Sequence, residues 1–142
     1  MAKSKAKAPV ISAQTVLGIY RLAHLNVEVV CKNQGIGGEF YFAPDEKGVP
    51  RIKIGIAEER FEEVLEVLLH EALEFVLCNN NHRYIPSGCP TGGSDTYIFH
   101  FDHSEFTIAV AHVAQFSAKV LPALKKHWQN NQKLLKSNEH GN

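Results

Sequence analysis

The spacing of apolar residues along the chain predicts seven elements, in the order helix, three strands, helix, strand and helix. In residues 12–25, Val16, Ile19, Tyr20 and Ala23 recur every three or four positions, which predicts a first helix. The short, turn-like links that follow predict an antiparallel meander. Its three strands are indicated by β-branched and aromatic residues over residues 27–31, 39–43 and 51–56.

The longest periodic segment covers residues 57–78 and predicts a helix with one broad apolar face. Acidic residues crowd its first turns, where they suit the positive end of the helix dipole. The proline and glycine content of residues 82–95 predicts a long loop, which is typical of a lid or the rim of a site. A fourth strand is predicted over residues 96–101. The apolar face of the long helix comprises Phe61, Val64, Leu65, Leu68, Ala72, Phe75 and Val76.

A second long helix is predicted to begin at Asp102, because Asp102 and Glu105 have the spacing of a capping box. Its apolar stripe runs from Phe106 to Leu124, and Pro122 is expected to bend or interrupt it. Together the elements predict the α+β class, with a small, mostly antiparallel sheet of about four strands and helices packed on that sheet.

Length and charge narrow the range of functions. The chain has 142 residues, which suits one domain, predicted here over residues 11–128. Residues 1–10 are expected to be a flexible basic tail, and residues 129–142 a polar tail that frays. Lys and Arg together number 15, as do Asp and Glu, so no net charge favours nucleic acid as a partner.

The apolar runs and the cysteines indicate a compartment. No run reaches the ~18 apolar residues of a membrane span, so no membrane association is expected. Three cysteines, an odd number, and the lack of a secretory leader predict thiols in a reducing compartment. We therefore expect a cytoplasmic protein, whose oligomeric state the sequence leaves open.

The chemistry-bearing sequence is His70-Glu71-Ala72-Leu73-Glu74, inside the first long helix. In zinc peptidases, two histidines four apart bind the metal, and the glutamate after the first acts on a bound water. Here Glu74 takes the second ligand position, which a carboxylate oxygen fills well. We therefore expect His70 and Glu74 to hold one divalent metal, with Glu71 as the general base. Glu71 lies near the border between the polar and apolar arcs of the helix, where we expect a second element to cover it. Zinc is the first expectation. Manganese and iron are the alternatives, because a carboxylate is a harder ligand than the imidazole it replaces.

A third ligand has to come from another element, because positions four apart on one helix supply two. His103 is preferred, since it lies beside the predicted cap at the junction of strand and helix. His100 and Glu105 are the alternatives, although Glu105 already has a role in the capping box. In the competing interpretation, His70 and the glutamates on its stripe form a solvated face, because His–Glu pairs at this spacing are common neighbours.

The order of elements resembles the minimal zincin-like metallopeptidase fold, in which a small sheet precedes a His-Glu-x-x-His helix. The resemblance covers residues 27–124 in topology and His70 and Glu71 in strict motif, and Glu74 departs from the pattern. It implies a metal-dependent hydrolase of peptide or amide bonds, with residues 51–56 lining the cleft. The chain also resembles small phage or prophage proteins with a similar His-Glu-Ala helix, which implies the cytoplasm of a bacterial host.

Two alternatives stay open. A structural zinc site around Cys78, His82, Cys89 and His100 is a rival metal site, although its spacing fits no usual pattern. The alternative function is a non-catalytic interaction module of phage or prophage origin. It would bind a peptide or a host protein through an open strand edge or the acidic helix face.

Overall fold

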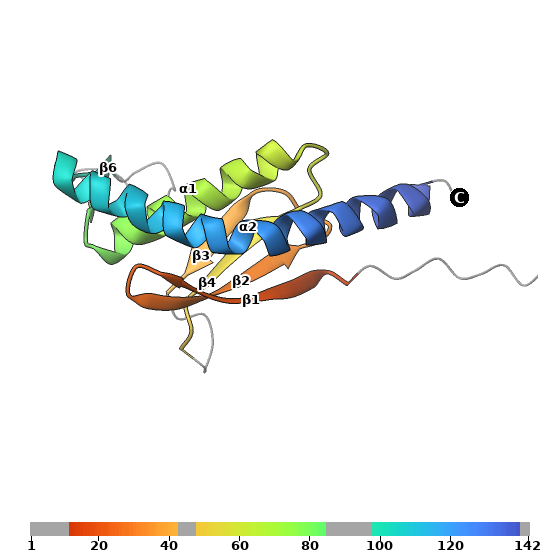
Figure 1. Cartoon of the computed structure of the whole chain (residues 1–142), viewed down its shortest axis with the longest axis horizontal. Helices are drawn as coiled ribbons and strands as arrows, with labels where there is room; N and C mark the ends of the chain where they lie inside the picture. Colours follow the sequence, from red (N-terminus) through yellow and green to blue (C-terminus); the bar gives the residue numbers. More distant parts are fainter. Residues whose placement is uncertain (1–11, 43–47, 85–97, 140–142) are drawn as a thin grey trace, which may run out of the picture.

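The computed structural model describes residues 12–42, 48–84 and 98–139. It shows two layers, a four-stranded sheet and two long helices that cover one of its faces (Figure 1). The predicted α+β class and the number of strands in the main sheet are confirmed. The main sheet comprises β1 (Gln14–Leu22), β2 (Leu25–Lys32), β3 (Gly38–Tyr41) and β4 (Arg51–Gly55), and the helices are α1 (Phe61–Asn79) and α2 (His103–Glu139).

The sheet has the strand order β1-β2-β4-β3, which corrects the predicted meander. β1 and β2 form an antiparallel hairpin, β4 lies parallel to β2, and β3 pairs antiparallel with β4. β4 therefore lies in the interior of the sheet, and its Ile52 and Ile54 are fully buried. Since both edges of β4 are paired, β4 does not line a cleft as the resemblance implied. Within the described residues, the free edges of the main sheet belong to β1 and β3.

The prediction of a helix over residues 12–25 is wrong, because this segment forms β1 and the turn into β2. The register between β1 and β2 shifts between Val16 and Gly18, a β-bulge that breaks the strict alternation of a strand. Gly18 has φ +150°, a conformation that side chains disfavour. With the alternation broken, the apolar residues of β1 fall at a spacing that imitates a helix.

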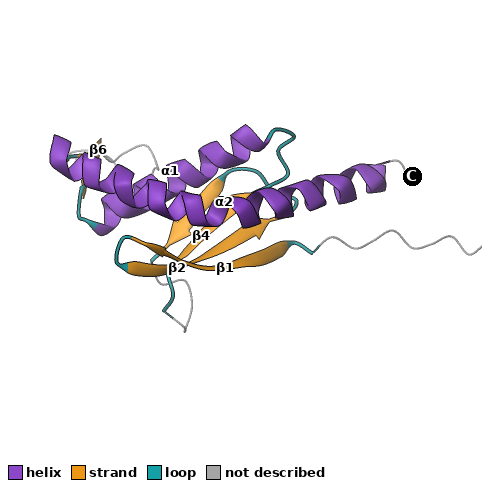
Figure 2. Cartoon of the chain, in the orientation of Figure 1, coloured by secondary structure: helices purple, strands orange, loops and turns teal. Residues whose placement is uncertain are grey.

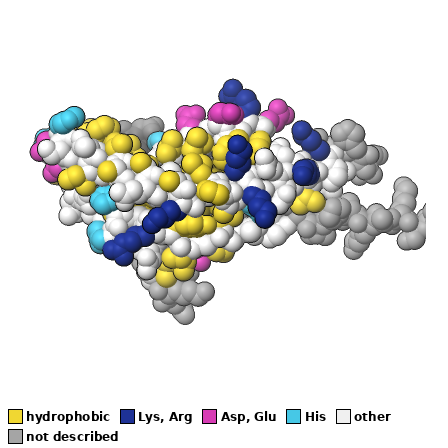
Figure 3. Space-filling model, viewed as in Figure 1, with side chains coloured by type: hydrophobic (Ala, Val, Ile, Leu, Met, Phe, Trp, Pro, Cys, Tyr) yellow, Lys and Arg dark blue, Asp and Glu magenta, His cyan; other side chains and the backbone are white. Residues whose placement is uncertain are grey.

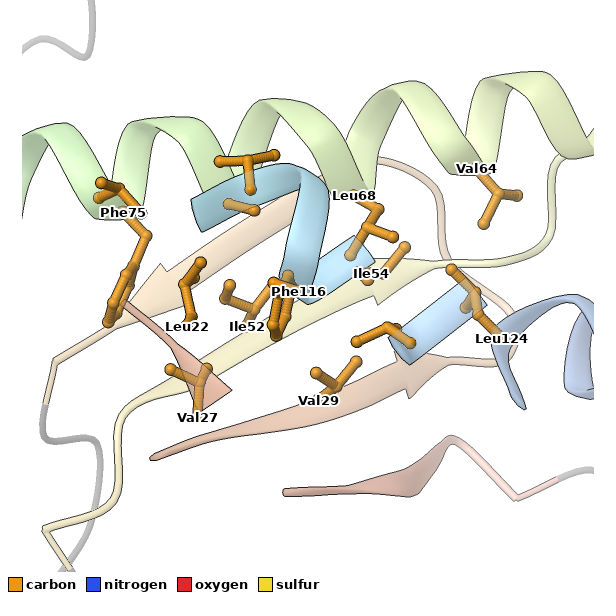
Figure 4. Close-up of a cluster of buried hydrophobic side chains, with 14 of the residues drawn as sticks. Leu22, Val27, Val29, Ile52, Ile54, Val64, Leu68, Phe75, Phe116 and Leu124 are labelled. Carbon is orange, nitrogen blue, oxygen red and sulfur yellow. The ribbon is translucent and has the colours of Figure 1, made fainter. Parts of the chain in front are cut away.

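Both helices pack on the same face of the sheet and against each other (Figures 1 and 2). α1 lies over β3 and β4, whereas α2 crosses β1. Figure 4 shows the side chains that meet between these layers. The predicted apolar stripes are largely confirmed, and the fully buried side chains include Leu22, Val27, Val29, Ile52, Ile54, Val64, Leu68, Phe116 and Leu124.

The fourth predicted strand is much shorter than expected and lies outside the main sheet. It is β6 (Ile98–Phe99), which pairs antiparallel with β5 (Arg83–Tyr84) in a separate two-stranded sheet. Most of the predicted loop and residues 96–97 lie outside the described residues. The capping box is confirmed, because the backbone N–H groups of Asp102 and Glu105 each donate to the other residue's carboxylate at 2.8 Å.

The helix α2 continues to Glu139, so the tail expected to fray from residue 129 is helical over most of its length. Pro122 does not interrupt the helix. By length and composition α2 could cross a membrane, but it packs on β1 and α1. A core helix passes the same test, so α2 does not overturn the expectation of no membrane association.

The C-terminal half of α2 is fixed by Asn33, which is 4% exposed at the end of β2. The Asn33 Nδ2 donates to the Ser12 carbonyl and to Thr15 Oγ1, both at 2.8 Å. His127 Nε2 donates to Asn33 Oδ1 at 2.9 Å, and Asn131 Nδ2 donates to the Asn33 carbonyl at 2.7 Å. The bonds from His127 and Asn131 to Asn33 stabilise α2 as a helix past residue 129.

Candidate functional site

The helix α1 places His70, Glu71 and Glu74 beside the edge of the sheet. His70 Nε2 and Glu74 Oε2 are 3.4 Å apart. The His70 side chain is 68% exposed, whereas that of Glu74 is 13% exposed. The two side chains that the sequence proposes as metal ligands are therefore neighbours, with one open to solvent and the other largely covered.

Glu71 is the buried member of the group, with 8% exposure. It packs against Gly38 at the start of β3, where an added Cβ would lie 2.5 Å from Glu71 Cγ and 2.7 Å from its Oε1. Glycine at position 38 thus makes room for the Glu71 side chain. This agrees with the place of Glu71 at the border of the apolar arc, where a second element was expected to cover it.

Burial raises the pKa of the Glu71 carboxyl above its usual value, because the charged form loses hydration. The neighbouring imidazole of His70 opposes this rise. Within the described part of the chain, the Glu71 carboxyl forms no hydrogen bond and no ion pair. Its lone pairs are therefore available to a water molecule or a ligand.

An open groove of about 490 Å³ runs along the N-terminal half of α1, and we call it the acidic groove. One wall is the loop that leads into β3, and the other is α1 together with the residues before it. Figure 3 shows acidic side chains gathered over α1. The lining residues are Ile36, Gly37, Gly38, Glu58, Glu63, Glu66, Val67, His70 and Glu71.

A second cavity of about 370 Å³ follows along α1, and we call it the apolar pocket. It lies between α1 and the segment from β6 to the first turn of α2. The rings of Phe101 and Phe106 stack at 5.3 Å between their centres. His70 lines both cavities and therefore marks their junction. The lining residues of the apolar pocket are His70, Leu73, Glu74, Leu77, Phe99, Phe101 and Phe106.

The structure does not bring a third ligand to His70 and Glu74. Among residues 12–42, 48–84 and 98–139, no three His, Cys, Asp or Glu side chains are grouped so as to hold a metal. His103 is exposed at the first residue of α2, and Glu105 is held in the capping box. His103 precedes Phe106 by one helical turn, so it belongs to the turn of α2 that borders the apolar pocket.

The rival structural zinc site gains no support from the described residues. His82 Nδ1 lies 3.1 Å from the His100 carbonyl, and the His100 N–H donates to the His82 carbonyl at 2.8 Å. These contacts join β5 to β6 without a metal. Burial raises the pKa of the Cys78 thiol, which disfavours the thiolate that zinc requires. Cys89 lies outside the described residues.

The wall formed by Ile36, Gly37 and Gly38 was not predicted to belong to the site. In the sequence these residues indicate a turn before a strand, and they are distant from the motif. Their position follows from backbone hydrogen bonds to the end of β4, in which the Gly55 N–H donates to the Gly37 carbonyl at 2.7 Å. Only the paired glycines, which permit close approach of the backbone, hinted at this contact.

Compared with family models, curated proteins and solved structures, the chain matches none of them. The function is therefore argued from the geometry of the two cavities and their junction.

Proposed function

We propose that this protein is a metal-dependent hydrolase of peptide or amide bonds, with its reacting groups where the acidic groove meets the apolar pocket. His70 and Glu74 are two ligands of one divalent metal, and Glu71 is the general base. The observation that carries the proposal is the 3.4 Å separation between His70 Nε2 and Glu74 Oε2, beside the buried residue Glu71, whose carboxyl has no partner among the described residues.

The separation of this pair fits a metal. Two ligand atoms bound to one tetrahedral ion at about 2.0–2.1 Å lie about 3.4 Å apart. Catalytic zinc sites have three protein ligands, of which the described residues supply two here. His103 stays our candidate for the third position: it is not grouped with His70 and Glu74 here, but it lies one helical turn before Phe106, which lines their pocket.

A divalent metal held by His70 and Glu74 would polarise the substrate carbonyl as a Lewis acid. Glu71 accepts a proton from the attacking water and returns it to the leaving amine. Its burial and its lack of an internal donor support this role, because no bond within the described protein has to break first. His70 lies where a substrate backbone passes from one cavity to the other, and the apolar pocket receives a side chain next to the reacting bond.

Replacing Glu71 by glutamine tests this assignment, because the substitution keeps the shape and removes the base. With fluorescein-labelled casein as substrate and zinc supplied, we expect the hydrolysis rate to fall by about 10²-fold or more. The metal content should stay that of the unsubstituted protein. Glu62→Gln is the matched control, since Glu62 is exposed on α1 and lines neither cavity. Unchanged hydrolysis in Glu71→Gln, or none in the unsubstituted protein, would contradict the proposal.

A second candidate function is non-catalytic binding of a partner protein. One observation favours it: Phe101 and Phe106 are stacked and are 36% and 38% exposed at the apolar pocket. Aromatic side chains exposed in this way are typical anchors of protein interfaces. This function needs no metal, so removing metal with a chelator would leave partner binding intact.

A further inference from the structure

Four glutamates line the acidic groove, so negative side chains outnumber positive ones along it. Glu63 pairs with Arg60 at 2.6 Å, whereas Glu58 and Glu66 have no ion-pair partner among the described residues. No lysine or arginine lines the groove. The negative potential along α1 therefore stays available to a ligand from outside.

The floor of the groove adds an independent indication of a ligand. Glu71 as a whole is 8% exposed and lines the groove, and its carboxyl has no hydrogen-bond donor within the described residues. In native structures, acceptors in such largely buried residues are usually satisfied by water or by a ligand. A ligand in the groove can therefore supply a donor to Glu71.

The wall opposite α1 carries one exposed apolar side chain, Ile36, followed by two glycines. An added Cβ on Gly37 would meet nothing within 4 Å, so the wall leaves open space at that glycine. A peptide backbone can approach such a wall closely while its side chains reach the glutamates on the other side.

We infer that the acidic groove binds an extended, lysine- or arginine-bearing segment of a polypeptide, with Glu58 and Glu66 facing its cationic side chains. The inference names the substrate class of the proposed hydrolase. It rests on that proposed function only for the cleavage of the bound segment. Binding itself needs no metal. In a substrate, the basic residue lies on the groove side of His70 and an apolar residue on the pocket side.

The test uses the full chain in the presence of a chelator, so that its result is independent of metal binding and of hydrolysis. The probes are a labelled, blocked peptide of alternating alanine and lysine, and the same peptide with glutamate in place of lysine. Binding is measured by fluorescence anisotropy at low and high salt. The groove variant is Glu58→Gln/Glu66→Gln. The matched control is Glu59→Gln/Glu62→Gln, which removes the same charge near the same helix end from residues that do not line the groove.

We expect the lysine peptide to bind, the glutamate peptide not to bind, and salt to weaken binding. The groove variant should bind the lysine peptide about fivefold more weakly, while the control variant changes little. Equal weakening in both variants would show that the peptide responds to the overall negative charge of this region and not to the groove, and would overturn the inference. Equal binding of both peptides, or no binding of the lysine peptide, would overturn it as well. If the lysine peptide does not bind, the proposed metal site and hydrolysis can still be correct. If the protein does not hydrolyse peptides, binding of the lysine peptide can still be correct.

Discussion

The amide of Asn33 joins three parts of the fold, and Asn33→Ala measures how strongly that junction stabilises the protein. Its Nδ2 donates to the Ser12 carbonyl and to Thr15 Oγ1, and its Oδ1 accepts from His127 Nε2. The substitution removes all three bonds. It keeps the bond from Asn131 to the backbone carbonyl, so one hydrogen bond between residue 33 and α2 remains. The bonds from Trp128 and Gln132 of α2 to the backbone of residues 56 and 58 also remain.

The magnitude follows from the surroundings of the three partners. An internal hydrogen bond contributes about 0.5–1.5 kcal/mol net, and a buried group left unpaired costs about 1–3 kcal/mol. Ser12 is exposed, so water replaces its bond, whereas Thr15 and His127 are half-buried. We therefore expect a loss of about 2–3 kcal/mol in the free energy of unfolding. With an unfolding entropy of about 2.1 cal/mol/K per residue over 142 residues, Tm falls by about 7–10 °C.

Thermal and urea unfolding at neutral pH, followed by circular dichroism, measure this loss. Asn26→Ala is the control, because Asn26 is exposed near the start of β2. The control should stay within about 0.5 kcal/mol of the unsubstituted protein. If Asn33→Ala also stays within that range, the hydrogen bonds of Asn33 do not fix the C-terminal half of α2, and the reasoning is wrong.

Two further predictions concern pH and packing. Burial lowers the pKa of His127 below its ordinary value of 6.5. Below about pH 6.5 this histidine is therefore protonated in the unfolded chain but still neutral in the folded one, so the free energy of unfolding falls as pH falls. Urea unfolding at about pH 7.5 and about pH 5.5 should show this fall, and His127→Gln should reduce it; an unchanged slope would refute the assignment. Gly38→Ala places a Cβ against Glu71 and should cost about 1–3 kcal/mol in urea unfolding, whereas a neutral effect would show that Glu71 moves aside freely.

The helix α1 was predictable because its information is local. An apolar residue every three or four positions determines both the helix and its buried face, and Val64, Leu68 and Phe75 are buried as that pattern requires. The same pattern placed Glu71 at the border of the apolar arc. Its burial therefore followed from the sequence, although the identity of the covering residue, Gly38, did not.

The strand β1 and the place of β4 were not predictable from local patterns. The bulge beside Gly18 shifts the register of β1, and a broken alternation looks like helical spacing. A short link says that two strands are neighbours in sequence, but not which strand inserts between them. β4 lies between β2 and β3 and packs under α1, and these long-range contacts leave no trace in the local pattern of its residues.

The candidate site, like the fold, could be predicted from the sequence only in part. The spacing of His70 and Glu74 on one helix made their proximity predictable. The groove wall could not be predicted, because its loop reaches α1 through hydrogen bonds to the end of β4. The place of His103 relative to the pair likewise depends on how α2 crosses the sheet, which no local pattern encodes.

The measurement that tests the central claim most directly is the metal content of the full chain, purified without tag or chelator. It is made beside His70→Ala and a control, His24→Ala, whose histidine lies exposed in the turn between β1 and β2. The account predicts about one equivalent of zinc, manganese or iron in the unsubstituted protein and in His24→Ala, and its loss in a folded His70→Ala. No metal in any of the three proteins, with folding unchanged, would contradict the metal site and the hydrolase built on it.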